Sequence, residues 1–326
     1  MMKVLVTGGA GFIGRHTVSH LLKQDCQVIV VDQRQDPKLP EDKSVTYYET
    51  DIVSEDLEQI FAVEQPDYCI HLAAHVSVPR SYENPHLDAE INIMGTINVL
   101  RACVRYKVRK IVFSSSAAVY GNPDIYPIEE QCTLDPQSFY GMSKYVAESY
   151  IRSFSTQYNL DYTILRYANV YGIREHRTGE DGVMTAFIER MAGGMPMIIY
   201  GDGRQTRDFV YVRDVAVANA LALSVGSCQT FNISSGVGLS LLELSGRLQE
   251  LYEQTNSVQF MPQKPGDIDR SILSNDKARN LLGWSPSYSL EDGLRAMIVH
   301  EYGVKKNSEQ QPFAPNLQDY NPITAI

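Results

Sequence analysis

The feature of this sequence that most constrains its fold is a glycine-rich turn between an apolar strand-like segment and a helix-like one. "KVLVT" at 3–7 is followed by "GGAGFIGRH", in which Gly8, Gly11 and Gly14 fit GxxGxxG and Gly9, Gly11 and Gly14 fit GxGxxG. Such a turn brings backbone N–H groups close to a pyrophosphate at the helix N-terminus. Because a bare glycine pattern also fits an ordinary turn, the surrounding segments decide its meaning.

Strand-like and helix-like segments alternate through the first half of the chain. Short segments rich in β-branched or aromatic residues predict strands at 3–7, 27–32, 45–50, 68–73, 110–115 and 162–168. The stretches between them have helical spacing, notably 13–24, 54–64, 85–107 and 139–158. Strands that alternate with helices are typical of a parallel sheet covered on both faces. We therefore predict an α/β fold with a doubly wound sheet of the Rossmann type.

The pattern becomes irregular after about residue 170, where Gly and Pro are frequent. Short strand-like segments at 197–200 and 230–234 lie among helix-like ones at 183–192, 214–224 and 240–254. We predict a Rossmann domain over 1–170, and a smaller, loop-rich α/β substrate lobe over 171–303 with some exchange of chain between the lobes. The polar, proline-bearing stretch 304–326 is expected to be a surface tail.

Composition sets the broad class of protein. The chain has 326 residues, of which 44% are hydrophobic and 21% charged, as in ordinary globular proteins. A net charge of -10 without a basic stripe argues against nucleic acid as a partner. The five cysteines lack CxxC spacing, which favours reduced thiols and gives no metal site. Since we find neither a signal peptide nor an apolar run of membrane length, we expect a soluble cytoplasmic protein with no membrane partner.

An acidic residue ends the second predicted strand. Asp32 follows "QVIVV", the position from which a carboxylate can bind both ribose hydroxyls of a dinucleotide and repel a 2′-phosphate. We therefore predict NAD rather than NADP as the cofactor. Arg34 is the one nearby feature that favours NADP, because an arginine there could hold the extra phosphate.

Three serines end the fifth predicted strand, in "SSSAAVYG" at 114–121, and "YGMSK" follows with Tyr140 and Lys144. Four residues apart on a helix, these two side chains share one face and can point at one cofactor. A free tyrosine has a pKa of about 10, so we expect Lys144 and an oxidised nicotinamide to lower it. Each motif alone also fits a strand end or a surface pair. Their combination with the glycine turn favours a catalytic site.

Together these motifs resemble those of the extended short-chain dehydrogenase/reductase family, and within it the nucleotide-sugar epimerases of the UDP-galactose 4-epimerase type. The resemblance runs from Lys3 to about Ala296. It rests on "TGGAGFIG", "DI" at 51–52, "HLAA" at 71–74, "NIMGT" at 92–96, "SSSAAVYG", "YGMSK", "LRYANVYG" at 165–172, "GDGRQTRDFVYVRD" at 201–214 and "KPGD" at 264–267.

The resemblance implies a cofactor site and a substrate site. The cofactor side comprises Gly8, Gly11, Phe12, Ile13, Gly14, Asp32, Asp51, Ile52, Leu72, Ala73, Ala74, Asn92, Ser114, Tyr140 and Lys144. The substrate side comprises Ser116, Asn169, Val183, Tyr200, Arg207, Lys264, Arg270 and Ser271. In that family Ser116 would pair with Tyr140 over the 4-hydroxyl of the sugar, so that Ser116, Tyr140 and Lys144 are the catalytic residues.

Four residues are expected to select the substrate. Arg207 resembles the diphosphate-binding arginine of the family, although a surface salt bridge would also explain it. Lys264 stands where many relatives have arginine, and Arg270 could take over part of that role. Ser271 falls where glucose-restricted bacterial relatives carry a tyrosine, so we expect room for a 2-acetamido group.

Ala117 and Ala118 narrow the reaction, because relatives that eliminate water carry an Asp-Glu pair there and decarboxylases keep a glutamate. We expect an NAD-dependent isomerase that inverts carbon 4 of a UDP-hexose or UDP-N-acetylhexosamine through a transient 4-keto sugar. A UDP-glucuronate 4-epimerase and a catalytically silent NAD-binding sensor are the alternatives. The resemblance also implies a homodimer formed through the helices 85–107 and 139–158.

Overall fold

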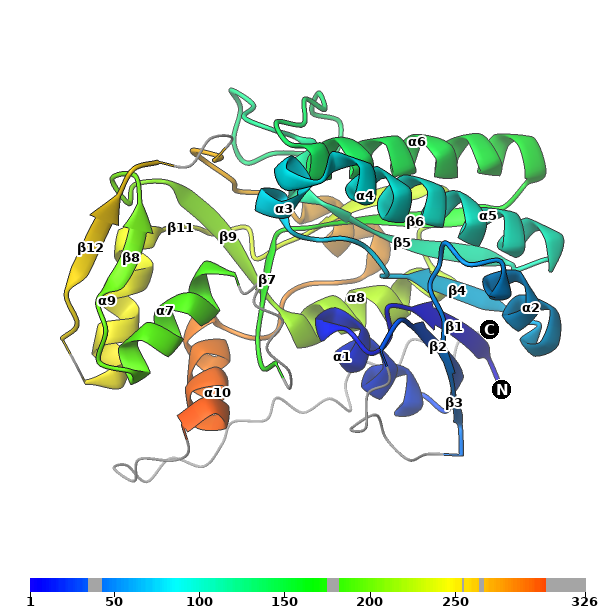
Figure 1. Ribbon diagram of the computed structural model, residues 1–326, viewed down its shortest axis with the longest axis horizontal. Coiled ribbons are helices and arrows are strands. Elements are labelled where there is room, and N and C mark those ends of the chain that lie inside the picture. The colour runs from blue at the N-terminus through cyan, green and yellow to red at the C-terminus, as the bar shows by residue number, and fades with distance from the viewer. Residues whose placement is uncertain (35–42, 175–181, 254, 264–266, 303–326) are drawn as a thin grey trace.

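A seven-stranded sheet forms the larger part of the computed structural model, which describes residues 1–34, 43–174, 182–253, 255–263 and 267–302 (Figure 1). The strand order is β10-β6-β5-β4-β1-β2-β3, and every neighbouring pair is parallel. The prediction of a doubly wound, Rossmann-type sheet is confirmed. Its strands are β1 (Lys3–Thr7), β2 (Gln27–Asp32), β3 (Val45–Glu49), β4 (Tyr68–His71), β5 (Lys110–Ser116), β6 (Asp161–Tyr167) and β10 (Gln229–Ile233).

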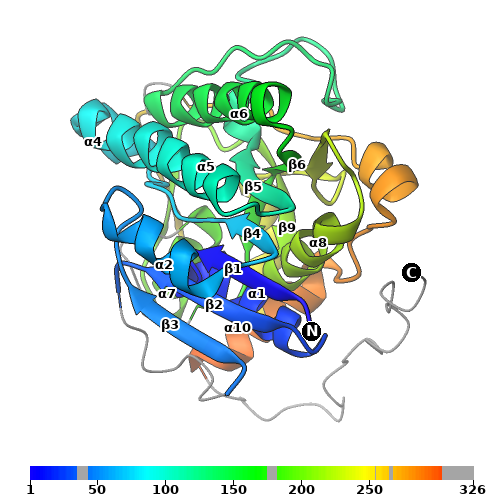
Figure 2. The same cartoon turned by 90° about the vertical axis from the view of Figure 1, so that its right-hand side faces the viewer.

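Helices cover both faces of this sheet because its strands are apolar on both sides. Val4 and Val6 pack into the core beneath α1 and α8, whereas Leu5 packs into the core beneath α2, α5 and α6. Figure 2 shows α5 and α6 on one side of the sheet and α1 and α8 on the other. The bounds are α1 (Phe12–Leu22), α2 (Asp56–Glu64), α5 (Thr96–Arg105), α6 (Phe139–Tyr158) and α8 (Val212–Ser224).

The sheet changes winding direction at β1. β2 and β3 lie on one side of β1, and β4, β5 and β6 lie on the other. The carboxyl ends of parallel strands meet at one edge, and a crevice opens where the winding direction changes. The glycine turn follows β1, Asp32 ends β2, and the three serines end β5. The topology therefore brings these separate motifs to one edge of the sheet.

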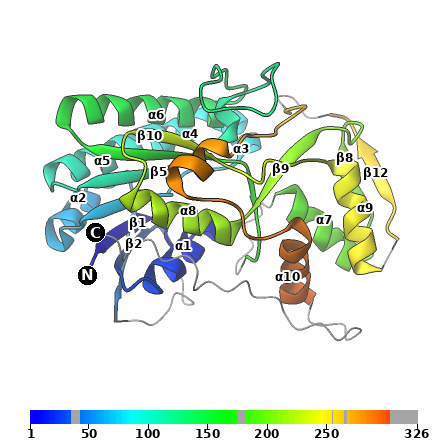
Figure 3. The same cartoon turned by 180° about the vertical axis from the view of Figure 1, so that it is seen from behind.

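A smaller lobe follows β6 (Figure 3). It has its own apolar core, which includes Phe187, Leu244 and Leu294. One small sheet has the order β11-β9-β7 and the other pairs β12 with β8. The strands are β7 (Asn169–Tyr171), β8 (Met197–Tyr200), β9 (Thr206–Tyr211), β11 (Gly238–Ser240) and β12 (Val258–Met261). The helices of this lobe are α7 (Val183–Ala192), α9 (Leu241–Tyr252) and α10 (Leu290–Tyr302), whereas the short π-helix η3 (Ala278–Leu282) packs on α8 and β10 of the large sheet.

The chain returns to the large sheet after building part of the smaller lobe. α8 packs against α1, and β10 pairs in parallel with β6 at the sheet edge. Because these elements complete the large sheet, its part of the chain does not end at residue 170. The predicted surface tail 304–326 lies outside the described residues.

The stretch 85–107 is not the single helix that its spacing predicts. It comprises α4 (Pro85–Ala89), a π-helix η1 (Glu90–Gly95) and α5, with α3 (Val78–Glu83) before it. The side chain of Asn84 accepts a hydrogen bond from the N–H of Leu87 at 3.1 Å, which begins a new helix there. None of the described helices is both long and apolar enough to span a lipid bilayer.

Candidate active site

The glycine turn after β1 packs too closely against its surroundings to accept side chains. Gly8 has a φ of +70°, and a Cβ there would lie 2.6 Å from the backbone nitrogen of Ala73. A Cβ on Gly14 would lie 2.1 Å from the carbonyl oxygen of Gly8. No described side chain caps the first turn of α1, which begins after Gly11. Its N–H groups are therefore arranged to bind a phosphate.

Asp32 lies beside this turn at the end of β2. Its carboxylate accepts hydrogen bonds from the N–H of Ala10 at 3.0 Å and from the N–H of Arg34 at 3.2 Å. Burial raises the pKa of Asp32, while these two N–H groups oppose the rise. The carboxylate thus both supports the glycine turn and faces the crevice.

A cavity of about 2050 Å³ runs from the glycine turn into the smaller lobe. Of the predicted site residues it is lined by Gly8, Gly11, Phe12, Ile13, Gly14, Asp32, Asp51, Ile52, Leu72, Ala73, Ala74, Ser114, Ser116, Tyr140, Lys144, Asn169, Val183, Tyr200, Arg207 and Ser271. Within the described ranges, no three His, Cys, Asp or Glu side chains are grouped to hold a metal ion.

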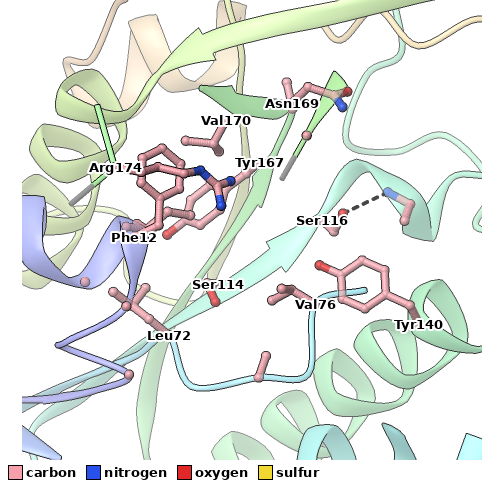
Figure 4. A pocket seen from close by; sticks show the side chains of 18 of the residues that line it. Phe12, Leu72, Val76, Ser114, Ser116, Tyr140, Tyr167, Asn169, Val170 and Arg174 are labelled. Atoms are coloured by element: carbon pink, nitrogen blue, oxygen red, sulfur yellow. Dashed lines mark hydrogen bonds between the residues drawn. The ribbon is translucent and has the colours of Figure 1, made fainter. Parts of the chain in front are cut away.

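The three serines at the end of β5 have three different partners, and the dashed line in Figure 4 marks the hydrogen bond of Ser116. The carbonyl oxygen of Ser114 accepts a hydrogen bond from the Nζ of Lys144 at 3.0 Å. The hydroxyl of Ser115 donates to Glu148 at 2.6 Å, deep in the core. The hydroxyl of Ser116 accepts from the N–H of Ala118 at 3.1 Å, in the short helix η2 (Ala117–Val119). Of the three hydroxyls, that of Ser116 is therefore the one placed beside Tyr140.

Tyr140 is held in the first turn of α6 by neighbouring serines. The hydroxyl of Ser138 accepts from the N–H of Gly141 at 3.0 Å and so caps the helix. The hydroxyl of Ser81, in α3, accepts from the N–H of Tyr140 at 3.2 Å. Figure 4 shows the phenol pointing toward Ser116 from the opposite wall of the cavity. The helix register therefore fixes where the phenol lies.

Burial is the largest influence on the pKa values of both Tyr140 and Lys144. Burial raises the pKa of Tyr140 to about 12, although a hydrogen bond with Ser116 opposes this rise. Burial lowers the pKa of Lys144 to about 8. The Nζ of Lys144 donates to the carbonyl oxygen of Ser114. The lowering of the tyrosine pKa that we expect from Lys144 together with an oxidised nicotinamide stays a prediction.

Asn92, predicted to line the dinucleotide site, does not line the cavity. It is 2% exposed and its amide oxygen accepts from the N–H of His75 at 2.8 Å. Its amide nitrogen donates to the carbonyl oxygen of His75 at 2.9 Å. The π-helix turns Asn92 inward, so that it supports the segment after β4.

Arg207, which we predict to bind the diphosphate of the substrate, lines the cavity and is held by several partners. Its guanidinium forms an ion pair with Asp267 and donates to the carbonyl oxygen of Thr206 at 2.9 Å. Burial lowers the pKa of Arg207, and the charge of Asp267 opposes this. The partner carboxylate thus comes from the "KPGD" segment.

Arg270, which we predict to contact the substrate, does not line the cavity. Its guanidinium carbon lies 4.5 Å from the ring centroid of Tyr126, a cation–π arrangement at the surface. The hydroxyl of Tyr126 donates to the carbonyl oxygen of Arg270 at 3.1 Å. Lys264, the other predicted phosphate ligand there, lies outside the described residues.

Several residues that sequence reasoning did not assign also line the cavity, among them His75, Val76, Gln205 and Asp267. Gln205 lies in the motif "GDGRQTRDFVYVRD" and Asp267 in "KPGD", so the sequence indicates that both are near the site. His75 directly follows "HLAA". Their side-chain directions depend on the packing of the loops, which the sequence pattern does not give.

Fold and site together define a nucleotide-dependent enzyme of the short-chain dehydrogenase/reductase class. The uncapped helix N-terminus fits a pyrophosphate and Asp32 fits ribose hydroxyls, so the residues present fit NAD. Within this class the chain belongs to the NAD dependent epimerase/dehydratase family, whose model matches residues 4–234.

Relatives named as epimerases resemble almost the whole chain. A putative UDP-glucose 4-epimerase of Methanocaldococcus jannaschii is 40% identical over 297 residues, which cover 90% of this chain and 97% of the relative. The structure of UDP-glucose 4-epimerase from Thermotoga maritima with UDP-glucose is 41% identical, with a TM-score of 0.88 and coverage of 92% and 98%. UDP-N-acetylglucosamine 4-epimerase from Methanobrevibacter ruminantium is 33% identical, with a TM-score of 0.86 and coverage of 92% and 97%.

Proposed function

We propose that this protein catalyses the NAD-dependent 4-epimerisation of a UDP-hexose or UDP-N-acetylhexosamine. The observation that carries the proposal is that one cavity joins the glycine turn, the Ser116–Tyr140–Lys144 group and the Arg207 region. Relatives covering nearly the whole chain are named UDP-glucose and UDP-N-acetylglucosamine 4-epimerases, which supports the same reaction.

In the proposed reaction the protein moves one proton at the 4-hydroxyl oxygen of the sugar. NAD, when bound, supplies reversible oxidation and reduction at carbon 4. Tyr140 takes the proton in the first half of the cycle and returns it in the second. Ser116 hydrogen-bonds the same oxygen and keeps it within reach of the phenol. Lys144, buried on the same helix face, contributes positive charge that favours the phenolate.

Ala117 and Ala118 restrict the reaction to this step. Both line the cavity beside Ser116, and neither side chain can donate or accept a proton. Elimination of water would need a further acid and base on neighbouring carbons. We therefore propose epimerisation rather than dehydration.

The 4-keto sugar must turn over between the two halves of the reaction, so affinity has to come from the nucleotide. Arg207 is placed to bind the diphosphate in exchange for part of its ion pair with Asp267. Val183 and Tyr200 line the same end of the cavity, and we propose that they flank the uracil. Ser271 lines the cavity with a small side chain, which supports acceptance of a 2-acetamido group.

A neutral sugar is the substrate we favour over a uronate. Arg270, which precedes Ser271 in the chain, is a cation that could pair with a uronate carboxylate, but its guanidinium stacks on Tyr126 instead of lining the cavity. Because a UDP-glucuronic acid 4-epimerase from Bacillus cereus is 30% identical to this chain, UDP-glucuronate is also tested as a substrate.

We further propose a homodimer formed through α5 and α6, and action in the cytoplasm. α6 has exposed aromatic side chains at Tyr150 and Tyr158, and Met94 is exposed in η1 just before α5. Removal of such a surface from water favours association. All five cysteines are unpaired, which supports a reducing compartment.

Isomer assays with UDP-glucose, UDP-N-acetylglucosamine and UDP-glucuronate, run in parallel on the purified protein, test the function. We expect the protein to interconvert UDP-glucose with its 4-epimer, and UDP-N-acetylglucosamine with its 4-epimer. Conversion of UDP-glucuronate alone would reassign the substrate. Retention of NAD without turnover of any of the three would favour the non-catalytic sensor.

A further inference from the structure

A buried carboxylate that the proposed mechanism does not use lies beside the catalytic pair. Asp88, on α4, is 1% exposed. Its Oδ1 lies 3.1 Å from Nδ1 of His75 and 3.3 Å from Nδ2 of Asn92. Burial of a charge is costly unless partners replace the lost water. Among the described residues, His75 is the only basic side chain within ion-pair distance of Asp88.

Asn92 connects Asp88 to the helix that carries the catalytic residues. Its Nδ2 also donates to the hydroxyl of Ser143 at 3.0 Å, and that hydroxyl donates to the carbonyl oxygen of Tyr140 at 3.0 Å. The same Asn92 side chain binds both the N–H and the carbonyl oxygen of His75. Asp88, Asn92 and His75 therefore form one hydrogen-bonded unit between the inner face of α6 and the cavity wall.

The charge of Asp88 acts on both catalytic groups. After burial, it is the main cause that raises the pKa of Tyr140 and the main cause that opposes the lowering of the pKa of Lys144. Glu148, one turn further along α6 and paired with Arg166, also opposes the lowering of the pKa of Lys144, but less than Asp88 does.

The remaining titratable groups around the pair come from two strands. His71, on β4, lies near Lys144, and burial lowers the pKa of His71 to about 3, so it stays neutral. Tyr167, on β6, lies near Tyr140, and burial raises its pKa far above the ordinary range. Neither group changes charge near neutral pH. Of these groups, Asp88 is the negative charge that acts on both Tyr140 and Lys144.

We propose that Asp88 is a positioning residue that anchors His75 at the cavity wall and, bound through Asn92 and Ser143 to the first turn of α6, places a buried negative charge beside Tyr140 and Lys144 that sets the pH above which the site becomes active. This inference rests on the proposed function, in which Tyr140 must lose its proton before it can act as a base. Removal of the charge should make that loss easier.

The test is the pH profile of kcat/KM for UDP-glucose in the wild type and Asp88→Asn, which keeps the shape of the side chain. We expect the acidic limb of the variant to move to lower pH. At a pH on that limb, the variant should retain a fraction of its plateau kcat/KM that is at least about threefold larger than the fraction retained by the wild type. An unmoved limb, or one moved to higher pH, overturns the proposal.

Two further variants separate charge from structure. Glu90→Gln removes a carboxylate two residues along the chain, whose side chain is 47% exposed and pairs with His86, so its profile should match the wild type. His75→Asn keeps an N–H donor where Nδ1 lies, so its limb should also stay in place. A limb that moves as far in His75→Asn as in Asp88→Asn would assign control to His75 and overturn the proposal.

A readout without turnover separates this inference from the proposed function. The ultraviolet difference between the protein and Tyr140→Phe reports ionisation of Tyr140 during a pH titration. Asp88→Asn should shift that ionisation to lower pH, and Asp88→Ser carries the same test if Asp88→Asn does not fold. A shift in a protein that epimerises no UDP-sugar defeats the proposed function alone. No shift in an active enzyme defeats the role of Asp88 alone.

Discussion

Glu148 on α6 and Arg166 on β6 form a buried, two-pronged ion pair with N–O distances of 2.9 Å and 2.7 Å. Ser115 donates to the same carboxylate, and Arg166 also donates to the hydroxyl of Tyr120 at 2.9 Å. The pair therefore joins the catalytic helix to the strand end that carries the serines and to the loop beyond it.

Glu148→Gln should destabilise the protein by about 3–5 kcal/mol, because it leaves the Arg166 guanidinium buried without its counter-charge. Urea unfolding at neutral pH measures the change, with Glu291→Gln at the exposed pair with Arg247 as the matched control. A loss below about 1 kcal/mol, as for an exposed pair, would contradict it.

The same pair predicts how stability changes with pH. Burial alone would raise the pKa of Glu148, but the hydrogen bonds and charge of Arg166 more than offset this and lower it below 4.5. A carboxyl with a lower pKa in the folded state stabilises above its unfolded pKa and loses that contribution as the pH falls. The stability difference between wild type and Glu148→Gln should therefore shrink below pH 4.5. A constant difference would contradict the assignment.

Tyr140→Phe should reduce turnover by more than about 100-fold, since it removes the general acid–base. UDP binding, measured by calorimetry, should stay nearly unchanged, because in the proposed mechanism the phenol contacts the sugar and not the nucleotide. Ser116→Ala should cost less, because it removes only a hydrogen bond to the reacting oxygen. Near-normal turnover in Tyr140→Phe would refute the mechanism.

The purified protein should retain bound NAD, and Asp32→Ala should loosen it and raise the relative affinity for NADP. Direct titration of both cofactors measures this. Asp32→Asn is the control, since its side-chain oxygen can still accept from the N–H of Ala10 and support the glycine turn. A wild type that prefers NADP would show that Arg34, rather than Asp32, determines the choice.

Tyr150→Asp should weaken a homodimer, because Tyr150 is 40% exposed on the outer face of α6. Sedimentation at micromolar concentration should show a dimer for the wild type and a monomer fraction for the variant. Val63→Asp, at a 74% exposed position on α2, serves as the control and should leave the dimer intact. A monomeric wild type would exclude this interface.

Ser271→Tyr should depress turnover of UDP-N-acetylglucosamine by at least about 10-fold while sparing UDP-glucose, a difference of about 1.4 kcal/mol. A tyrosine ring would fill space that the 2-acetamido group needs as the sugar turns. Ser271→Thr, which adds little volume, is the control and should affect both substrates equally. Equal losses on both substrates in Ser271→Tyr would show that this position does not select between them.

The parts of the fold that the sequence predicts well carry local signals. α6 spans 139–158 as predicted, because Ser138 caps it and its apolar spacing continues to Tyr158. The glycine turn was readable for a similar reason, since Gly8 and Gly14 occupy positions that exclude side chains. Local backbone demands of this kind leave a mark on the residues themselves.

The parts that sequence reasoning missed depend on contacts between distant segments. Asn92 lies in the expected motif, yet the π-helix turns it toward His75 instead of the cavity. Arg270 lies beside the substrate motif, yet Tyr126 attracts its guanidinium away from the cavity. The partner of Arg207 is Asp267, which is 60 residues away. No periodicity or spacing encodes these choices.

The pairing of β10 with β6 determines how the protein should respond to truncation and to heat. A fragment ending near residue 170 would expose the ladder edge of β6 and the apolar surface that α8 covers on α1. An uncovered parallel edge of this kind invites aggregation. The smaller lobe would lose its connection to the large sheet through β10, which holds it beside the crevice. The two lobes should therefore not fold when they are expressed as separate fragments. In the whole protein, heat should unfold both lobes in a single cooperative transition.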